Sequence, residues 1–290
     1  MNHRKHHWVP RSYLKAWCDS NIPALHEPYV WKFPKNGGDG QKKAPHNIFS
    51  ETDFYTIFLR DGSRDLRLEH GLATLESNFC RIREKRIVKR EPLDPEEKVW
   101  FCAFAAAMHF RTRRQRSHFQ RQWGHVVEVA GDLQGALAAV TPEQRRRNKP
   151  PTTLGETVGP PLSISDVKVL ADRPIQNMLP TMIAESLPIL ARMNLAIFTT
   201  EDDIGFVTSD HPCVWFDPEG GRWPPRLRSR TIEVFMPVSP SSLAVLCWEA
   251  FPSYRNTRLP EVDEANRFQQ ISCEEHFIVR RNATKSIWFS

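Results

Sequence analysis

Apolar residues in the first half of the chain recur with helical spacing. Between residues 63 and 90 they follow one another at intervals of four and three, as on the buried face of an amphipathic helix: Leu68, Leu72, Leu75, Phe79 and Ile82. Asp94-Pro95-Glu96-Glu97 then has the N-cap, proline and glutamate of a capping box. The next run, Val99–Met108, is apolar nearly all round and predicts a buried central helix, which continues into a basic end at 109–118.

The rest of the chain alternates between proline-rich segments and short apolar runs. Residues 141–162 are rich in proline and polar side chains, which predicts a loop or a linker. The helical pattern at 165–193 is interrupted at Pro174, Pro180 and Pro188, so we expect a broken or kinked helix. A further short helix is expected at 261–270. Strands are expected at 29–33, 54–59, 195–199, 205–208, 213–216, 232–237, 243–248, 277–279 and 287–289.

This order of elements predicts an α+β fold, in which a helical first half packs on a mostly antiparallel C-terminal sheet. The turn at 36–40 is typical of a hairpin, and we expect this early hairpin to join the C-terminal sheet. We interpret residues 1–290 as a single α+β domain with its loop or linker at about 141–162.

The first seventeen residues contain more histidines and aromatic rings than a disordered terminus would. Pro10 suits a first helical turn, so Arg11–Trp17 are expected to form a short helix that packs through Tyr13, Leu14 and Trp17. The segment is therefore expected to be mainly an anchor. His6 and His7, which precede it, are its candidates for chemistry.

Charge is unevenly distributed along the chain. Residues 1–150 hold 27 Lys+Arg against 17 Asp+Glu, a net charge of +10, whereas residues 151–290 hold 13 against 17, a net charge of −4. A basic half is compatible with RNA or DNA as a partner, although a solvated basic face is the commoner explanation. The chain has no apolar run near the ~20 residues of a membrane span and no apolar segment behind its basic start. Six scattered cysteines without a C-x-x-C pair suggest buried thiols in a reduced, cytoplasmic protein.

Several short motifs together resemble a bacterial family catalogued only as domain of unknown function 4238. The opening His7–Trp17 is similar to its "H-x-V-P-x-x-Y-L-x-x-F" start, and the remaining similar pieces occur in the family's order: Phe54-Tyr55, Leu68-Glu69, Leu75-Glu76, Arg111-Thr112, Ser209-Asp210-His211-Pro212, Phe235–Pro240 and Asn266. The family tends to show Ser-Asp-Asn-Pro where this chain has Ser-Asp-His-Pro. The resemblance therefore indicates which residues to examine, but it implies no activity.

The main chemical candidates are polar residues that are far apart in the sequence. We take His7, Glu69, Arg111 and Asp210 as catalytic candidates, with His7 and Asp210 as ligands of a Mg or Mn ion that activates water. Arg111 would hold a scissile phosphate. Glu69 and Glu76 are two helical turns apart, about 10 Å along the axis, so they cannot bind one ion.

Each of these residues also has a structural interpretation. Asp210 suits a turn in which its carboxylate accepts backbone N–H groups. Glu69 and Glu76 are equally compatible with ion pairs to arginine across a helix interface, and His7 with a hydrogen-bonded histidine of the core.

A second set lies in the basic segment after the central helix. Arg113, Arg114, Arg116 and His118 are candidates for nucleic-acid binding. The spacing from Arg113 or Arg111 to His118 resembles the R-x4–6-H motif of HEPN ribonucleases. In a segment so rich in arginine, that spacing also arises by chance.

The sequence thus leaves two hypotheses. One is a nucleic-acid-directed hydrolase, on RNA more than DNA, of the kind used as a toxin or phage-defence effector. The other is a non-catalytic module that binds nucleic acid or a partner protein. G-x-G-x-x-G, P-loop and G-x-S-x-G motifs do not occur, which argues against nucleotide-fold enzymes and serine hydrolases of the usual kind.

Overall fold

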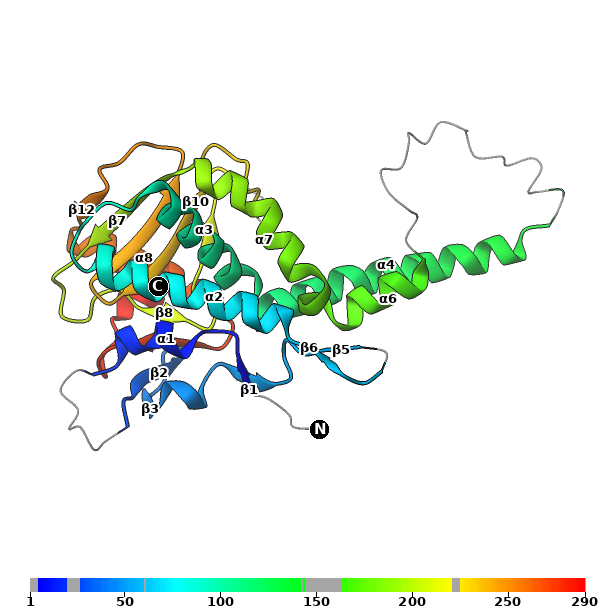
Figure 1. The fold of residues 1–290 in the computed structure, drawn as a ribbon, viewed down its shortest axis with the longest axis horizontal. Helices are drawn as coiled ribbons and strands as arrows, with labels where there is room; N and C mark the ends of the chain where they lie inside the picture. Colours follow the sequence, from blue (N-terminus) through cyan, green and yellow to red (C-terminus); the bar gives the residue numbers. More distant parts are fainter. Residues whose placement is uncertain are drawn as a thin grey trace.

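A five-stranded sheet lies between two helical layers in the computed structural model, which describes residues 5–19, 27–59, 61–141, 143, 163–220 and 225–289 (Figure 1). Its strand order is β12-β7-β11-β10-β9, and only the pairing of β12 with β7 is parallel. The strands are β7 (Asn194–Thr199), β9 (Val214–Phe216), β10 (Glu233–Ser239), β11 (Ser242–Cys247) and β12 (Tyr254–Asn256). The α+β prediction is confirmed.

Alternate side chains of this sheet enter two different cores. Ala244 and Leu246 of β11 face the main core, which includes residues of α2 (Arg67–Ile82), α3 (Pro95–Phe110) and α7 (Pro174–Arg192). Leu243 and Val245 face a second core with residues of α8 (Leu259–Ser272). Burial on both faces explains why these strands read as continuous apolar runs in the sequence.

The early hairpin forms a sheet with two strands of the C-terminal half, as expected, but this sheet is separate from the five-stranded sheet. Its strands β2 (Val30–Pro34) and β3 (Gln41–Lys43) pair in the order β3-β2-β13-β8 with β13 (His276–Val279) and β8 (Thr208–Ser209). Two further pairs are small: β1 (Lys5–His7) with β4 (Ser50–Thr52), and β5 (Ile57–Phe58) with β6 (Arg64–Asp65).

Other boundaries also differ from the sequence expectation. The strands expected at 54–59 and 205–208 shrink to β5 and β8, and 287–289 lies in the 3-10 helix η4 (Ser286–Phe289). The helical region 165–193 breaks at Pro174 into α6 (Ile164–Asp172) and α7, but Pro180 and Pro188 lie inside α7. The expected loop or linker at 141–162 lies almost wholly outside the described residues.

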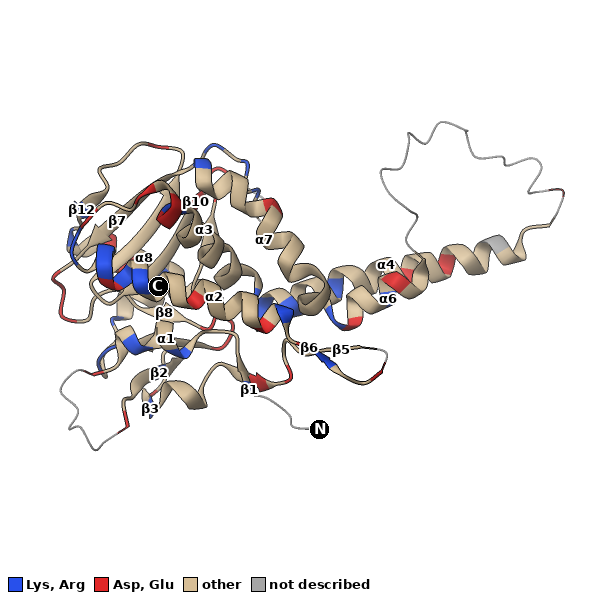
Figure 2. Ribbon diagram, in the orientation of Figure 1, with Lys and Arg blue, Asp and Glu red and all other residues tan. Residues whose placement is uncertain are grey.

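The central helix does not run on into the basic segment. It ends at Arg111, and Thr112 caps a new helix, α4 (Arg113–Ala139), by accepting the backbone N–H of Gln115. α4 and α6 run side by side away from the body as an arm (Figure 1). The basic residues of α4 lie at the end nearest the body (Figure 2).

The N-terminal segment is anchored in the main core, as expected. Helix α1 (Arg11–Leu14) and the 3-10 turn η1 (Lys15–Trp17) bury Tyr13, Leu14 and Trp17 completely. The Tyr13 hydroxyl donates to the Pro237 carbonyl at 2.5 Å, and the Trp17 indole donates to the Phe206 carbonyl at 2.9 Å. These bonds fix the N-terminal segment against β10 and the turn before β8, which are about two hundred residues away in the sequence.

The turn before β8 requires glycine at position 205. Gly205 has a φ of +69°, and a Cβ there would lie 2.0 Å from the Pro240 carbonyl oxygen. We expect Gly205→Ala to lower the free energy of unfolding by about 3 kcal/mol, because it adds a clash to a left-handed backbone. Gly124→Ala is the control, because a Cβ there meets open space in α4 and should stabilise the protein by about 0.5–1 kcal/mol. Urea unfolding measures both; equal midpoints would contradict the prediction.

Candidate functional site

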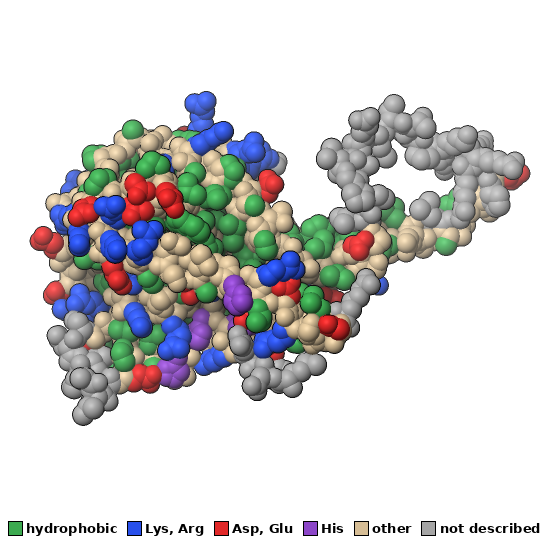
Figure 3. All heavy atoms as spheres, viewed as in Figure 1, with side chains coloured by type: hydrophobic (Ala, Val, Ile, Leu, Met, Phe, Trp, Pro, Cys, Tyr) green, Lys and Arg blue, Asp and Glu red, His purple; other side chains and the backbone are tan. Residues whose placement is uncertain are grey.

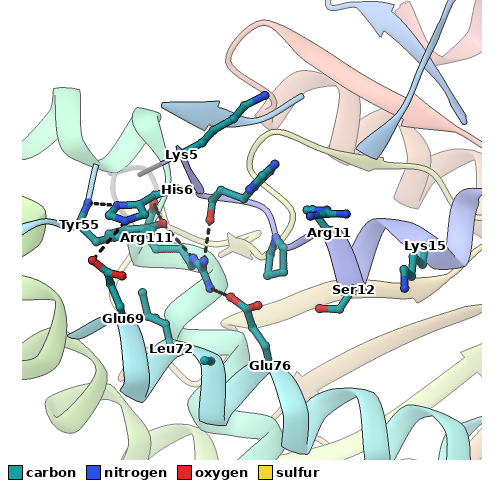
Figure 4. Close-up of a pocket in the computed structure, with 13 residues that line it drawn as sticks. Lys5, His6, Arg11, Ser12, Lys15, Tyr55, Glu69, Leu72, Glu76 and Arg111 are labelled. Carbon is teal, nitrogen blue, oxygen red and sulfur yellow. Dashed lines mark hydrogen bonds and ion pairs between the residues drawn. The ribbon is translucent and has the colours of Figure 1, made fainter. Parts of the chain in front are cut away.

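A cavity of about 420 Å³ opens between the N-terminal segment and α2 (Figure 4). We call it the N-terminal pocket. Its walls come from β1, α1, α2 and the C-terminal end of α3, so residues 5–15 meet residues of two helices there. Three of the sequence-predicted catalytic residues line it together: His7, Glu69 and Arg111. Asp210 does not; it lines a different cavity.

Arg111 connects three separate parts of this pocket. Its guanidinium donates to the Tyr55 hydroxyl at 3.0 Å, to Glu76 Oε1 at 2.8 Å and to the His7 carbonyl at 2.7 Å (Figure 4). The side chain is almost fully buried. Burial alone would lower its pKa, but Tyr55 and Glu76 raise the pKa of Arg111 above its ordinary value. Because these contacts occupy the guanidinium, Arg111 organises the pocket rather than presenting itself to a phosphate.

His6 and Glu69 form a buried pair at the other side of the pocket. His6 Nδ1 accepts the backbone N–H of Tyr55 at 2.9 Å, so its Nε2 carries the proton of the neutral ring. That nitrogen lies 3.2 Å from Glu69 Oε1. The His6 ring also stacks on Tyr55, with ring centroids 5.5 Å apart. The His6 ring, held by Tyr55, therefore lies directly against the Glu69 carboxylate (Figure 4).

His7 faces the pocket in a neutral form. Its Nε2 lies 3.2 Å from the His46 carbonyl oxygen, which can only accept, so Nε2 carries the proton. Burial, together with the nearby charges of Lys5, Arg11 and Arg111, lowers the pKa of His7 to about 4. The imidazole is consequently uncharged at neutral pH, with its lone pair on Nδ1.

The mouth of the pocket is positively charged. The exposed side chains of Lys5, Arg11 and Lys15 line it. Basic and histidine side chains gather on the surface over β1 and α1 (Figure 3). An anionic ligand would meet these three cations before it reached Glu69.

Asp210 has the structural role that its turn position suggested. Its carboxylate accepts the backbone N–H groups of Glu274, Glu275 and His276 at 2.8, 2.7 and 2.9 Å. The neighbouring His211 is completely buried, and its Nδ1 lies 3.0 Å from the Thr112 hydroxyl at the start of α4. The Ser-Asp-His-Pro turn thus joins α4 to β13. His7 and Asp210, the two proposed metal ligands, line different cavities.

The basic side chains at the start of α4 mostly contact other residues of the protein. Arg116 makes a bidentate contact with Glu51, at 2.6 and 3.0 Å, and Arg114 donates to the Ser272 carbonyl. Arg113 has only longer ion pairs, and His118 contacts the ring of Phe119. Burial lowers the pKa of His118. Of the four predicted nucleic-acid contacts, Arg113 is the arginine least committed to the fold.

From the sequence, His6 and His7 are both candidates and His7 is preferred. Tyr55 and the positively charged mouth of the pocket are not identified there. Strand β1 turns His6 and His7 to opposite faces, and only the pairing of β1 with β4 decides which one is buried. The Phe54-Tyr55 motif was a usable signal for Tyr55. The cysteines behave largely as expected, with Cys102, Cys213, Cys247 and Cys273 buried and all six free.

The described part of the chain lacks two further features. No group of three or more His, Cys, Asp or Glu side chains in the described ranges is placed to hold a metal ion. None of the helices that the structure describes is long and apolar enough to cross a membrane.

Comparison with known proteins gave one match. The family model described as "Protein of unknown function (DUF4238)" matches residues 5–284. The matched range includes every residue of the N-terminal pocket named above. No curated protein and no solved structure matches the chain.

Arg111 and Arg11 line the same pocket, but their substitution should change the free energy of unfolding by very different amounts. We expect Arg111→Met to lower the free energy of unfolding by about 2–4 kcal/mol, because it leaves partly or fully buried acceptors without their donor. Arg11 is exposed, so Arg11→Met should change the free energy by no more than about 0.5 kcal/mol. Denaturant unfolding of the two variants tests this, and equal losses would show that Arg111 has no organising role.

The neutral state of His7 predicts a dependence of stability on pH. An unfolded histidine titrates near pH 6.5, so between pH 6.5 and 4 the unfolded chain binds a proton that folded His7 does not. The protein should therefore lose stability as the pH falls through this range. His7→Gln should lose less, whereas the exposed control His125→Gln should follow the wild type. Thermal melts at pH 7, 6, 5 and 4 measure this, and parallel curves for His7→Gln and wild type would contradict it.

Proposed function

The chain belongs to the DUF4238 family of proteins of unknown function, and we propose that it is a nucleic-acid-directed hydrolase that acts on RNA rather than DNA. One observation carries the proposal: the His6–Glu69 pair and the cations Lys5, Arg11 and Lys15 converge on one cavity. A fixed carboxylate beside a basic entrance suits the cleavage of a phosphodiester.

The basic entrance would bind the nucleic-acid backbone. Lysine and arginine gain affinity for a polyanion by releasing its condensed counterions. Lys5, Arg11 and Lys15 belong to the N-terminal segment that Tyr13 and Trp17 anchor, so their backbone positions are fixed. The net charge of +10 in residues 1–150 would add long-range attraction.

Glu69 would act as the general base of the reaction. It would take the proton from a ribose 2′-hydroxyl, whose oxygen attacks the adjacent phosphorus while the 5′-oxygen leaves and takes a proton from water. His6 is a positioning residue in this scheme, because its Nε2 lies 3.2 Å from Glu69 Oε1 while its Nδ1 accepts the backbone N–H of Tyr55. The cations at the entrance would stabilise the charge that develops on the phosphate.

RNA is favoured because its 2′-hydroxyl supplies the nucleophile within the substrate. Such a reaction needs no group of protein ligands for a metal ion, and within the described ranges no such group was found. The Mg or Mn ion that the sequence suggested remains a proposal, which the experiment below includes. The role as a toxin or phage-defence effector also remains a proposal.

Cleavage of end-labelled RNA and DNA tests the proposal, with EDTA, Mg²⁺ or Mn²⁺ present in parallel. We expect the wild type to cut RNA, and Glu69→Gln to be slower by about 10²–10⁴-fold because it loses the general base. Glu84→Gln is the matched control, since this exposed glutamate lies in the same helical segment but not in the pocket. It should cut RNA like the wild type.

This assay distinguishes between the two hypotheses that the sequence leaves open. Retention of RNA by the wild type without cleavage under any of the ion conditions would favour the non-catalytic binding module. Equal cleavage by wild type and Glu69→Gln would show that the N-terminal pocket is not the site of the reaction.

A further inference from the structure

A second, smaller cavity lies on the other side of the segment that contains His7. It has a volume of about 140 Å³, and we call it the Trp8 pocket. Trp8, Lys32, Asn47, Arg113, Glu274 and Glu275 are among its lining residues. The two cavities are neighbours, because Trp8 follows His7 in the chain and Asn47 follows His46, whose carbonyl accepts a hydrogen bond from His7.

Trp8 brings an unsatisfied hydrogen-bond donor to this cavity. Its side chain is 6% exposed, and its indole N–H has no hydrogen-bond partner among the described residues. A buried donor without an acceptor is unfavourable, and native proteins rarely retain one without a reason. The indole nitrogen itself has almost no accessible surface, so a ligand of the Trp8 pocket would reach it only with a small rotation of the ring, and an acceptor atom would then remove this cost.

Arg113 supplies further donors at the same place. It lies over the Trp8 ring, 5.4 Å from the centroid. Its ion pairs with Glu51 and Glu275, at 3.7 and 3.8 Å, are too long for hydrogen bonds. Arg116 of the same helix instead binds Glu51 closely, so Arg113 is the guanidinium here whose planar set of donors can take a ligand.

The rim of the cavity beside Arg113 also offers acceptors. Glu274 and Glu275 have exposed side chains, while their backbone N–H groups are held by the Asp210 carboxylate at 2.8 and 2.7 Å. The rim is therefore fixed in the backbone and carries two carboxylates. A ligand of the Trp8 pocket would meet the donors of Arg113 and these acceptors next to one another.

We infer that the Trp8 pocket binds a guanine base of the RNA substrate, an inference that rests on the proposed function. Guanine presents two adjacent acceptors, O6 and N7, for which arginine is the commonest specific partner. Its N1–H and exocyclic amine are donors that suit a carboxylate. Adenine, cytosine and uracil do not combine two adjacent acceptors on one edge with two adjacent donors on the next.

Isothermal titration of the intact protein with GMP, AMP, CMP and UMP tests this inference. We expect GMP to bind at least about tenfold more tightly than the other three. Trp8→Phe, which removes only the indole N–H and part of the ring, and Arg113→Gln should each weaken GMP binding by about tenfold. Arg121→Gln is the control, because Arg121 is exposed on the same helix outside the cavity; it should bind GMP like the wild type.

Two results would overturn the inference: equal affinity for the four nucleotides, or unchanged GMP binding in both Trp8→Phe and Arg113→Gln. Thermal melts check that each variant is folded at the temperature of the titration.

The variant Glu69→Gln separates this inference from the proposed function. It should lose cleavage and keep the preference for GMP. RNA cleavage that depends on Glu69, together with equal binding of the four nucleotides, would refute the guanine site alone. Preferential GMP binding without any cleavage of RNA would support the guanine site and refute the hydrolase.

Discussion

The buried guanidinium of Arg111 is the interaction on which the rest of the site depends. It joins the N-terminal strand through the His7 carbonyl, helix α2 through Glu76 and the loop before β5 through Tyr55. A buried charge is tolerated only when its hydrogen-bonding groups are satisfied. The requirement to satisfy Arg111 therefore brings together three segments that are far apart in the sequence, and the N-terminal pocket is the space that they enclose.

The position of Arg111 follows from the break between α3 and α4. Arg111 ends the apolar helix, and Thr112 caps the basic one. Because α3 is buried nearly all round, the side chain of Arg111 at its C-terminal end lies in the protein interior. His211 contacts the Thr112 hydroxyl at this same junction. One helix junction thus supports both the N-terminal pocket and the turn that contains Asp210.

The histidines near the N-terminus show how a strand divides neighbouring residues between two roles. His6 is turned inwards, where it stacks on Tyr55 and lies against Glu69, whereas His7 stays neutral at the pocket wall. Trp8 then faces the second cavity. Three consecutive side chains therefore contact a carboxylate, a pocket wall and a neighbouring cavity. This explains why histidine and aromatic residues are concentrated in the anchored N-terminal segment.

The sequence by itself determined the local features of this protein. The stripe of α2, the capping box at Asp94, the anchor residues Tyr13 and Trp17 and the α+β order of elements all depend on neighbours a few residues away, which periodicity reveals. Only the tertiary structure decided which polar residues meet. Glu69 and Arg111 share a pocket while Asp210 lies elsewhere. The contacts of Arg111 join residues that are 35 to 104 positions apart in the sequence, and they depend on helix packing and strand pairing, which leave no periodic signal.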